Sequence, residues 1–315
     1  MGPILLILAY ASIAVFVVAV VWRAITIARL PIHLRWELYP VAHEKGRASY
    51  GGSYLEESDW WTKPRKSSLL GELKVMVPEI LLLAGVREHN RSHWLRTFPF
   101  HFGLYLIGGL AALLLFGGLV TVLGGDVSPN AGLLGSGLYH LTYVVGYAGL
   151  GLGLTGSIAL LVRRTLDADY REYTKKGDYF NLVFFIVTMS VALLAHLTQD
   201  PSFSALRTFS AQMITLDLSS IGTTIGAGSQ LLVLEIVLAC LLIAYIPLTH
   251  MSHFFTKYFM YHDIRWSDEP SFKGGKIERR VTEVLRYPVS WSAPHIRGDG
   301  KKTWVDVATS GVEEK

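Results

Sequence analysis

The sequence predicts an all-α integral membrane protein, a bundle of five membrane-spanning helices, on two observations. The 315-residue chain is 51% hydrophobic and only 17% charged, whereas a soluble domain carries about 25% charged residues. In addition, five stretches each hold about 20 mostly apolar residues, the length that crosses a hydrocarbon core of roughly 30 Å. The expected spans are 3–22, 98–123, 138–162, 180–197 and 231–255.

The first span is expected to be an uncleaved anchor rather than a signal peptide. It contains no charged residue, Arg23 and Arg29 follow it instead of preceding it, and it ends without a small-residue cleavage site. A loop over 27–97 then leads to the second span. Within this loop, the mixture of apolar and charged residues over 69–84 predicts an interfacial amphipathic helix that Pro78 interrupts.

The basic residues predict which side of the membrane each connection faces. Of the 29 Lys and Arg, 28 lie in the 27–97 loop and its flanks, in the connection between the third and fourth spans, and in the 256–315 tail. Arg207 is the exception. The positive-inside rule makes these segments cytoplasmic, so the amino terminus is expected outside and the carboxyl terminus in the cytoplasm. Because the basic residues follow topology, the net charge of +4 gives no support to nucleic-acid binding.

Four histidines lie within the expected spans, at two depths. His101 and His253 fall roughly 6–8 Å inside the cytoplasmic boundary, at 1.5 Å rise per residue, and His140 and His196 lie near the outer boundary. Ionisable groups are expensive inside a membrane and are therefore functional candidates. Low-spin electron-transfer haem takes two axial ligands from facing helices, so this arrangement predicts two haem b groups. A single interfacial histidine could instead bond a backbone carbonyl or a lipid headgroup.

The remaining histidines have other expected roles. His250 lies three residues before His253 and could replace it as ligand or bond a haem propionate. Solvated surface positions are expected for the other six: His33, His43, His89, His93, His262 and His295.

Several glycines lie in the second and third spans, and there are two explanations for them. Small residues allow the close approach of two helices or of a flat macrocycle. The residues Gly151, Gly153 and Gly156 also match a dinucleotide-binding pattern, but without a preceding strand or βαβ unit that match is spurious.

The single cysteine, Cys240, lies within the fifth span, where a packing role is expected. One cysteine is too few for a disulfide framework or for a cysteine-ligated iron–sulfur cluster within the chain. Any iron–sulfur chemistry therefore belongs to a partner.

The end of the fifth span carries a resemblance to a known family. Pro247 precedes His253 by six positions at the expected cytoplasmic end of the last span, which resembles the gamma subunit of respiratory nitrate reductase. The longer run through 261–266, together with 291–304, is similar to the cytochrome b subunits of sulfate-reducer electron-transfer complexes. Those subunits belong to the sulfite-reduction-associated and transmembrane complexes.

The resemblance implies a subunit of a membrane oxidoreductase in the cytoplasmic (inner) membrane. In this family a dihaem cytochrome b exchanges electrons with menaquinone and is partnered by a cytoplasmic, heterodisulfide-reductase-like iron–sulfur subunit. By motif position, His253 is implied as an inner ligand and His101 matches the ligand of the second span. The nitrate-reductase pattern places an outer ligand at the start of the fifth span, where this chain has Glu235. The outer pair is therefore expected to be His140 and His196.

Quinone chemistry requires polar groups near a haem edge and a path for protons. Around the outer haem the candidates are Tyr139, Tyr143, Gln199, Asp200 and Glu235. Glu235 could relay protons or pair locally. The outer connection over 198–230 could cover such a site or dock an external multihaem cytochrome c.

Two other functional classes compete with the cytochrome. In a transporter or channel component, Glu235 and the span histidines would form a proton or ion path. In a structural anchor, the histidines would be interfacial packing residues. Both alternatives predict a colourless protein.

Overall fold

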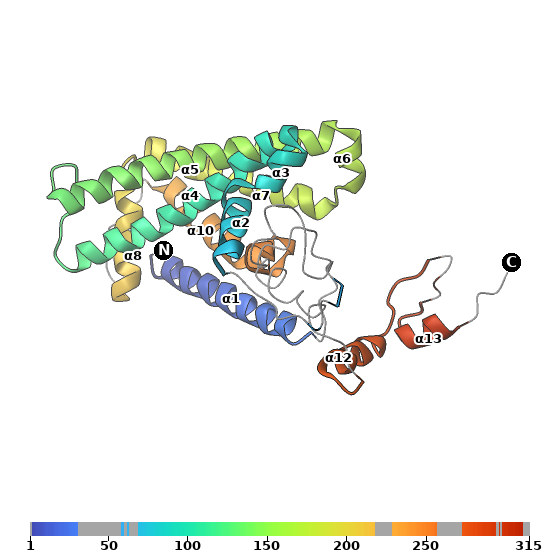
Figure 1. Ribbon diagram of the computed structural model, residues 1–315. Coiled ribbons are helices and arrows are strands. Elements are labelled where there is room, and N and C mark those ends of the chain that lie inside the picture. Colours follow the sequence, from blue (N-terminus) through green and yellow to red (C-terminus); the bar gives the residue numbers. More distant parts are fainter. Residues whose placement is uncertain are drawn as a thin grey trace. The chain divides into compact units, whose positions relative to one another are not determined.

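The structure, a computed structural model, describes residues 2–30, 58–59, 62, 69–217, 229–256, 273–293, 296 and 298–310. Within these ranges the chain is helical and contains no strand (Figure 1). It forms two compact units, Met1–Val18 with Val77–Thr249 and Ala19–Met76 with His250–Lys315, and each is described by itself. The motif residues 258–266 and the histidines His33, His43, His262 and His295 lie outside the described residues.

Within the described part of the chain, five helices are long and apolar enough to cross a membrane, which confirms the expected class of an all-helical, multi-pass membrane protein. They are α1 (Gly2–Ala28), α4 (Arg91–Val122), α5 (Leu133–Leu166), α7 (Lys176–Thr198) and α10 (Gln230–Tyr245). The shorter elements of the first unit include α3 (Ala84–His89), α6 (Ala168–Tyr173) and α8 (Ser204–Thr215). The helix expected over 69–84 is α2 (Leu69–Leu82), which continues through Pro78.

The fifth spanning helix stops earlier than the expected end at residue 255. α10 ends at Tyr245 and is followed by two short 3₁₀ turns, Ile246–Leu248 and His250–Ser252. Pro247 accounts for the break, because proline has no amide proton to donate and its ring crowds the preceding turn. His253 therefore lies after α10, at the start of a further helical stretch over 253–256, rather than within α10 itself.

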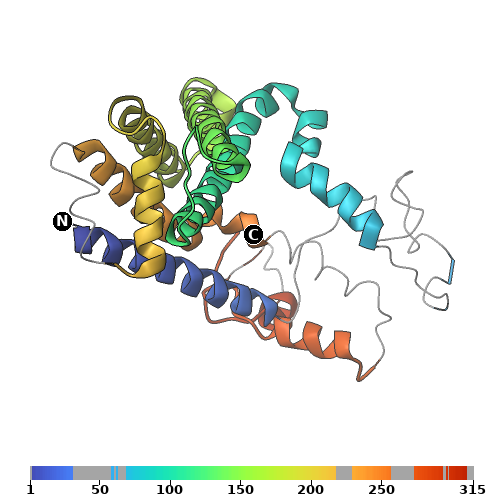
Figure 2. The same ribbon diagram turned by 90° about the vertical axis from the view of Figure 1, so that its left-hand side faces the viewer.

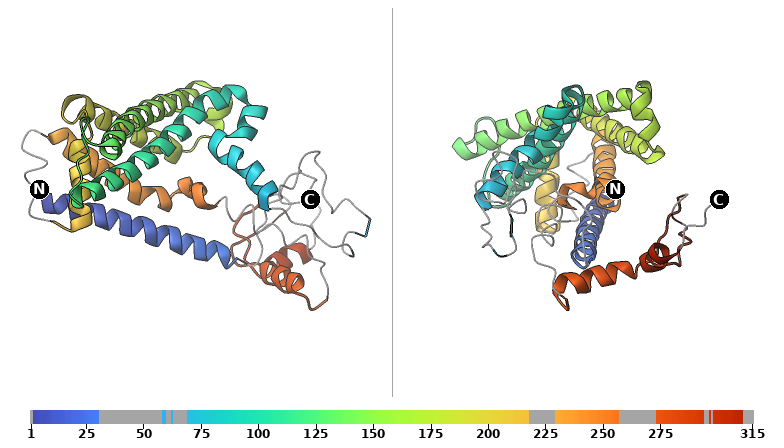
Figure 3. Two further views of the ribbon diagram at one scale, coloured as in Figure 1. Left: turned by 60° about the vertical axis from the view of Figure 1, so that its left-hand side comes forward. Right: turned by 45° about the vertical axis from the view of Figure 1, so that its right-hand side comes forward.

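Glycines bring α4 and α5 into backbone contact, and the left view of Figure 3 shows these two helices running side by side. A Cβ atom added at Gly103 would lie 2.3 Å from the amide nitrogen of Gly153, and one at Gly156 would lie 2.3 Å from that of Phe100. Only glycine fits such a contact. Helix packing therefore explains these glycines, and the face they occupy has no space for a macrocycle.

The connection from α2 to α4 is held by side chains of α4. Leu83 adopts a left-handed conformation (φ 51°) that ends α2. The Tyr105 hydroxyl donates to the Ile80 carbonyl (2.6 Å), and the Trp94 indole donates to the Leu82 carbonyl (2.7 Å). Because the last carbonyls of a helix have no partner within it, these two bonds fix the end of α2 against α4.

The helix α8 was not predicted, although its residues Phe209, Ala211 and Gln212 are buried. It lies across α4, close to the first turns of α1 (Figure 2). A buried cluster joins α1, α8 and α10 through Leu5, Leu6, Ala9, Phe209, Ile236 and Cys240. The packing role expected for Cys240 is thereby confirmed.

The second unit contains a small folded tail. Its helices are α12 (Lys276–Leu285) and α13 (Trp304–Thr309), and a bridge pairs Pro288 with Thr303. Thr303 caps α13 by exchanging hydrogen bonds with Asp306. These donors hold the pKa of Asp306 below its usual value.

Replacing Thr303 with Ala should loosen α13 alone. Loss of a capping side chain costs a helix about 1 kcal/mol, so amide hydrogen exchange over 304–309 should accelerate about five-fold. Hydrogen-exchange mass spectrometry on the full chain measures this change. Thr282→Ala in α12 is the matched control, because the Thr282 hydroxyl only bonds the Glu278 carbonyl one turn earlier. Equal exchange in both variants would contradict the capping role.

Candidate functional site

His101 lies in α4 with its ring held by the preceding turn. Its Nδ1 lies 2.8 Å from the carbonyl oxygen of Thr97 and 3.2 Å from the Thr97 hydroxyl. A carbonyl can only accept, so Nδ1 carries the proton and the lone pair is on Nε2. In histidines that ligate a metal through one ring nitrogen, the other ring nitrogen typically makes a hydrogen bond of this kind, which fixes the tautomer and the orientation of the ring.

The face of α4 that carries His101 differs from the face that contacts α5. At about 100° per residue, His101 lies roughly 160° around the helix from Gly103. Gly108 lies on the same side as His101 and is exposed, and no atom of a described residue lies within 4 Å of an added Cβ. The stripe formed by His101, Tyr105, Gly108 and Ala112 is thus half-buried to exposed and includes a residue without a side chain.

His253 belongs to the second unit, whereas His101 belongs to the first. The His253 ring is exposed, and its Nδ1 lies 3.3 Å from the carbonyl oxygen of His250. The lone pair is again on Nε2, as in His101. Nearby, the Arg23 guanidinium donates to the buried Ser252 hydroxyl (2.7 Å), which fixes the turn that precedes His253.

The inner histidines have the donor chemistry that a haem b iron requires. In both rings a backbone carbonyl accepts the Nδ1 proton, and imidazole Nε2 is a common axial donor to haem iron. On α4, the open surface at Gly108 is compatible with a flat macrocycle beside His101. The two residues therefore fit the expected cofactor in chemistry.

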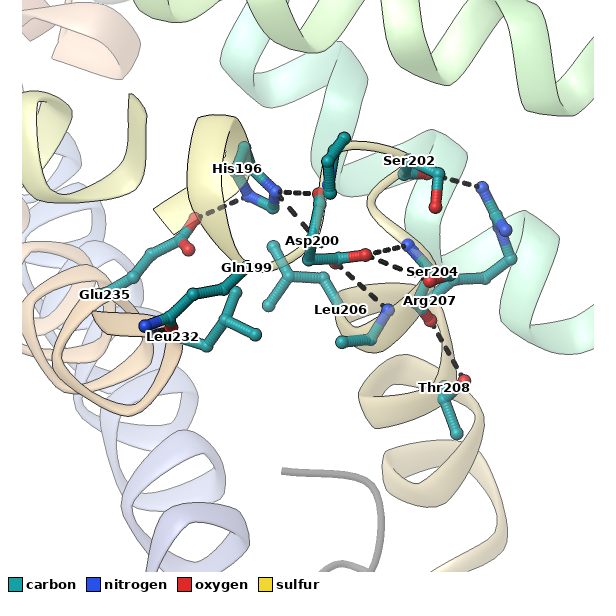
Figure 4. A network of polar contacts seen from close by, with 12 residues as sticks. His196, Gln199, Asp200, Ser202, Ser204, Leu206, Arg207, Thr208, Leu232 and Glu235 are labelled. Atoms are coloured by element: carbon teal, nitrogen blue, oxygen red, sulfur yellow. Dashed lines mark hydrogen bonds and ion pairs between the residues drawn. The ribbon is translucent and has the colours of Figure 1, made fainter. Parts of the chain in front are cut away.

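His196, one of the two histidines expected near the outer boundary, is fully buried between two acidic residues (Figure 4). Its Nε2 lies 3.1 Å from Oε1 of Glu235 in α10, and its Nδ1 lies 2.8 Å from the carbonyl oxygen of Asp200. The ring stacks on Phe203, with centroids 3.8 Å apart. The predicted residues His196, Asp200 and Glu235 are thus brought together from α7, the α7–α8 connection and α10.

The carboxylate of Asp200 is engaged in holding the start of α8. It accepts hydrogen bonds from the Ser204 amide (2.8 Å), the Ser204 hydroxyl (2.9 Å) and the Ala205 amide (3.0 Å). The first amides of a helix need such acceptors. Asp200 therefore positions α8 and, through its carbonyl, the ring of His196.

The other predicted outer residues are more scattered. Gln199 accepts a hydrogen bond from the Leu232 amide (3.3 Å), which ties α7 to α10. His140 is exposed on α5 and contacts the ring of Tyr139 edge-on. Tyr143 is exposed and lies against Tyr147. None of these contacts joins His140 to His196.

The outer pair fits a haem less well than the inner residues do. An axial iron would lie along the direction from His196 Nε2 that Oε1 of Glu235 occupies. Haem ligation by His196 would therefore require that contact to break. His140, on the other hand, has an exposed ring and no acidic partner among the residues that the structure describes.

Three residues outside the predicted set of site residues make contacts between segments that the sequence did not reveal. The Tyr147 hydroxyl donates to the His196 carbonyl (3.1 Å). Arg207, the one basic residue of the outer connections, is buried and lies against Gly117. The solvated position expected for His93 is wrong, since its ring is half-buried and packs against Tyr170. Side-chain contacts between distant segments leave no local pattern that could have predicted them.

Comparison of the chain with protein-family models, with curated proteins and with solved structures finds no match. The fold therefore defines the class at the level of an all-helical membrane protein with five candidate spans.

Proposed function

We propose that this chain is the cytochrome b subunit of a respiratory complex in the cytoplasmic membrane. In this proposal it passes electrons between menaquinone and a cytoplasmic iron–sulfur subunit of the heterodisulfide-reductase-like type. The amino terminus lies outside, and the basic loop and tail face the cytoplasm, where the partner binds. An external multihaem cytochrome c is a second candidate partner.

The observation that carries the proposal is the ring tautomer that His101 and His253 share, each set by a backbone carbonyl within its own unit. In each ring Nδ1–H donates to a backbone carbonyl and the lone pair is on Nε2. The region of His253 bears the most specific resemblance to the cytochrome family. Depth in the membrane adds support, since both residues are expected near the cytoplasmic boundary.

The chain's own residues would hold and orient the cofactor. His101 of α4 and His253 after α10 would be the inner axial ligands, with His250 as the alternate, and Gly108 would leave room beside α4. Bound haem b supplies reversible one-electron chemistry. Cys240 is the only cysteine, so any chemistry on an iron–sulfur cluster falls to the partner subunit.

Affinity purification in mild detergent tests this function. We expect a coloured preparation in which an iron–sulfur subunit co-purifies, with menaquinol analogues reducing the haem. A tagged chain that purifies without haem and without an iron–sulfur partner would contradict the proposal.

A proton- or ion-translocating component is the second candidate. One observation favours it: Glu235 and His196, both buried, face each other from two spanning helices. This class predicts a colourless protein that carries a proton or ion flux in vesicles, whereas a structural anchor predicts neither colour nor flux.

A further inference from the structure

The contact between His196 and Glu235 requires a proton. The Asp200 carbonyl fixes one hydrogen on Nδ1 of His196, since a carbonyl only accepts. At the other nitrogen, Nε2 and Oε1 of Glu235 are 3.1 Å apart. Two lone pairs would repel at that distance, so a proton lies between them, either on the imidazole or on the carboxyl group.

The second carboxylate oxygen of Glu235, Oε2, can accept a hydrogen bond from a further donor. Glu235 is 8% exposed, and its Oε2 is buried without a hydrogen-bond partner among the described residues. A buried polar atom without a partner costs about 1–3 kcal/mol. A donor hydroxyl would remove this penalty and would stand where it could transfer its proton.

The charged and titratable surroundings favour uptake of a positive charge by the pair. From the α7–α8 connection, Oδ2 of Asp200 lies 3.9 Å from Nδ1 of His196, and α8 adds the buried Arg207 near Asp200. From α5, Tyr147 donates its hydroxyl to the His196 carbonyl. The helix α1 carries no charged residue before Arg23. Asp200 is therefore the group placed to offset a proton added to His196 and Glu235.

We propose that His196 and Glu235 form an acid–base pair that accepts one proton from a hydroquinone hydroxyl, and that His196 is not a haem ligand. This inference rests on the proposed function, because ferric haem b is the oxidant. The hydroxyl O–H bond breaks and its proton goes to Oε2 of Glu235. One electron would pass to ferric haem b, and the hydroquinone is left as a neutral semiquinone. The proton then leaves to the outer aqueous phase, which resets the pair for the second proton and electron.

Glu235→Gln and His196→Gln separate proton transfer from haem ligation. We expect both variants, in the purified complex, to keep the wild-type haem content and to be reduced fully by dithionite, which needs no quinone site. Reduction by a menaquinol analogue should slow about 100-fold in Glu235→Gln, as for loss of a general base. The matched control is Asp126→Asn, which changes an exposed acid in the connection after α4 and should keep the wild-type rate.

Three outcomes would overturn parts of the account, and they are distinguishable. Loss of one haem in His196→Gln would make His196 a ligand, and a wild-type quinol rate in Glu235→Gln would remove the proton role. A wild-type complex without haem would contradict the proposed function itself. Should the variants fail to fold, infrared redox-difference spectra of the wild-type complex decide the matter: a carboxylic C=O band that shifts on ¹³C-glutamate labelling is expected, and its absence contradicts the pair.

Discussion

Replacing His101 with Ala should remove one haem b per chain. The ring is fixed by the Thr97 carbonyl at 2.8 Å, and Ala provides neither an axial donor nor a ring to hold one. The variant should lose that haem completely rather than keep it with altered ligation, because low-spin ligation needs both axial nitrogens. Haem quantitation against protein concentration measures it, and His253→Ala should give the same loss.

The matched control for this substitution is His89→Ala. His89 is exposed at the end of α3, so its removal should change neither haem content nor stability. His250→Ala tests the alternate inner ligand and should leave the haem content unchanged. Retention of the full haem complement by His101→Ala, in protein that elutes as the wild type does in size-exclusion chromatography, would refute the inner site.

A second large effect is expected from Gly103→Ala. The added Cβ would lie 2.3 Å from the Gly153 amide nitrogen and 2.9 Å from the Gly149 carbonyl oxygen. Both are backbone atoms in the neighbouring helix, so α4 and α5 would have to separate. Overpacking of this kind costs about 1–3 kcal/mol, occasionally more, and the midpoint of thermal aggregation in detergent should fall accordingly.

Gly151→Ala supplies the control for this packing contact. Gly151 lies in α5 only two residues from Gly153, yet nothing lies within 4 Å of its added Cβ. The substitution should keep or slightly raise the thermal midpoint, because Ala favours helix more than Gly does. If Gly103→Ala and Gly151→Ala had the same midpoint, the close contact between α4 and α5 would be wrong.

The five spans could be predicted because each depends on a local property, the length of an apolar run. The residues at which these helices begin and end could be predicted less well. The helix α4 begins at Arg91, ahead of the expected 98, because Asn90 accepts a hydrogen bond from the His93 amide and caps it. The early end of α10 follows from Pro247. The helix α8 has no comparable signal, since its start depends on three donors to Asp200.

The candidate site likewise combines features that can be predicted from a short stretch of sequence with contacts between residues far apart in the sequence. The expected depth of a residue in the membrane follows from its position along a span. This depth identified His101, His140, His196 and His253 as candidates. The direction in which each side chain points does not follow from its depth. His140 is exposed while His196 is buried against Glu235, 39 positions away. Because that contact joins two helices, only the packed structure could reveal it.

The central claim, that this membrane protein carries haem b, is tested most directly by one spectrum. The complex is purified in mild detergent and its reduced-minus-oxidised absorbance is recorded and normalised to protein. The account predicts b-type haem absorbance that His101→Ala diminishes by one haem per chain. A colourless wild-type protein that elutes as a folded species would contradict it.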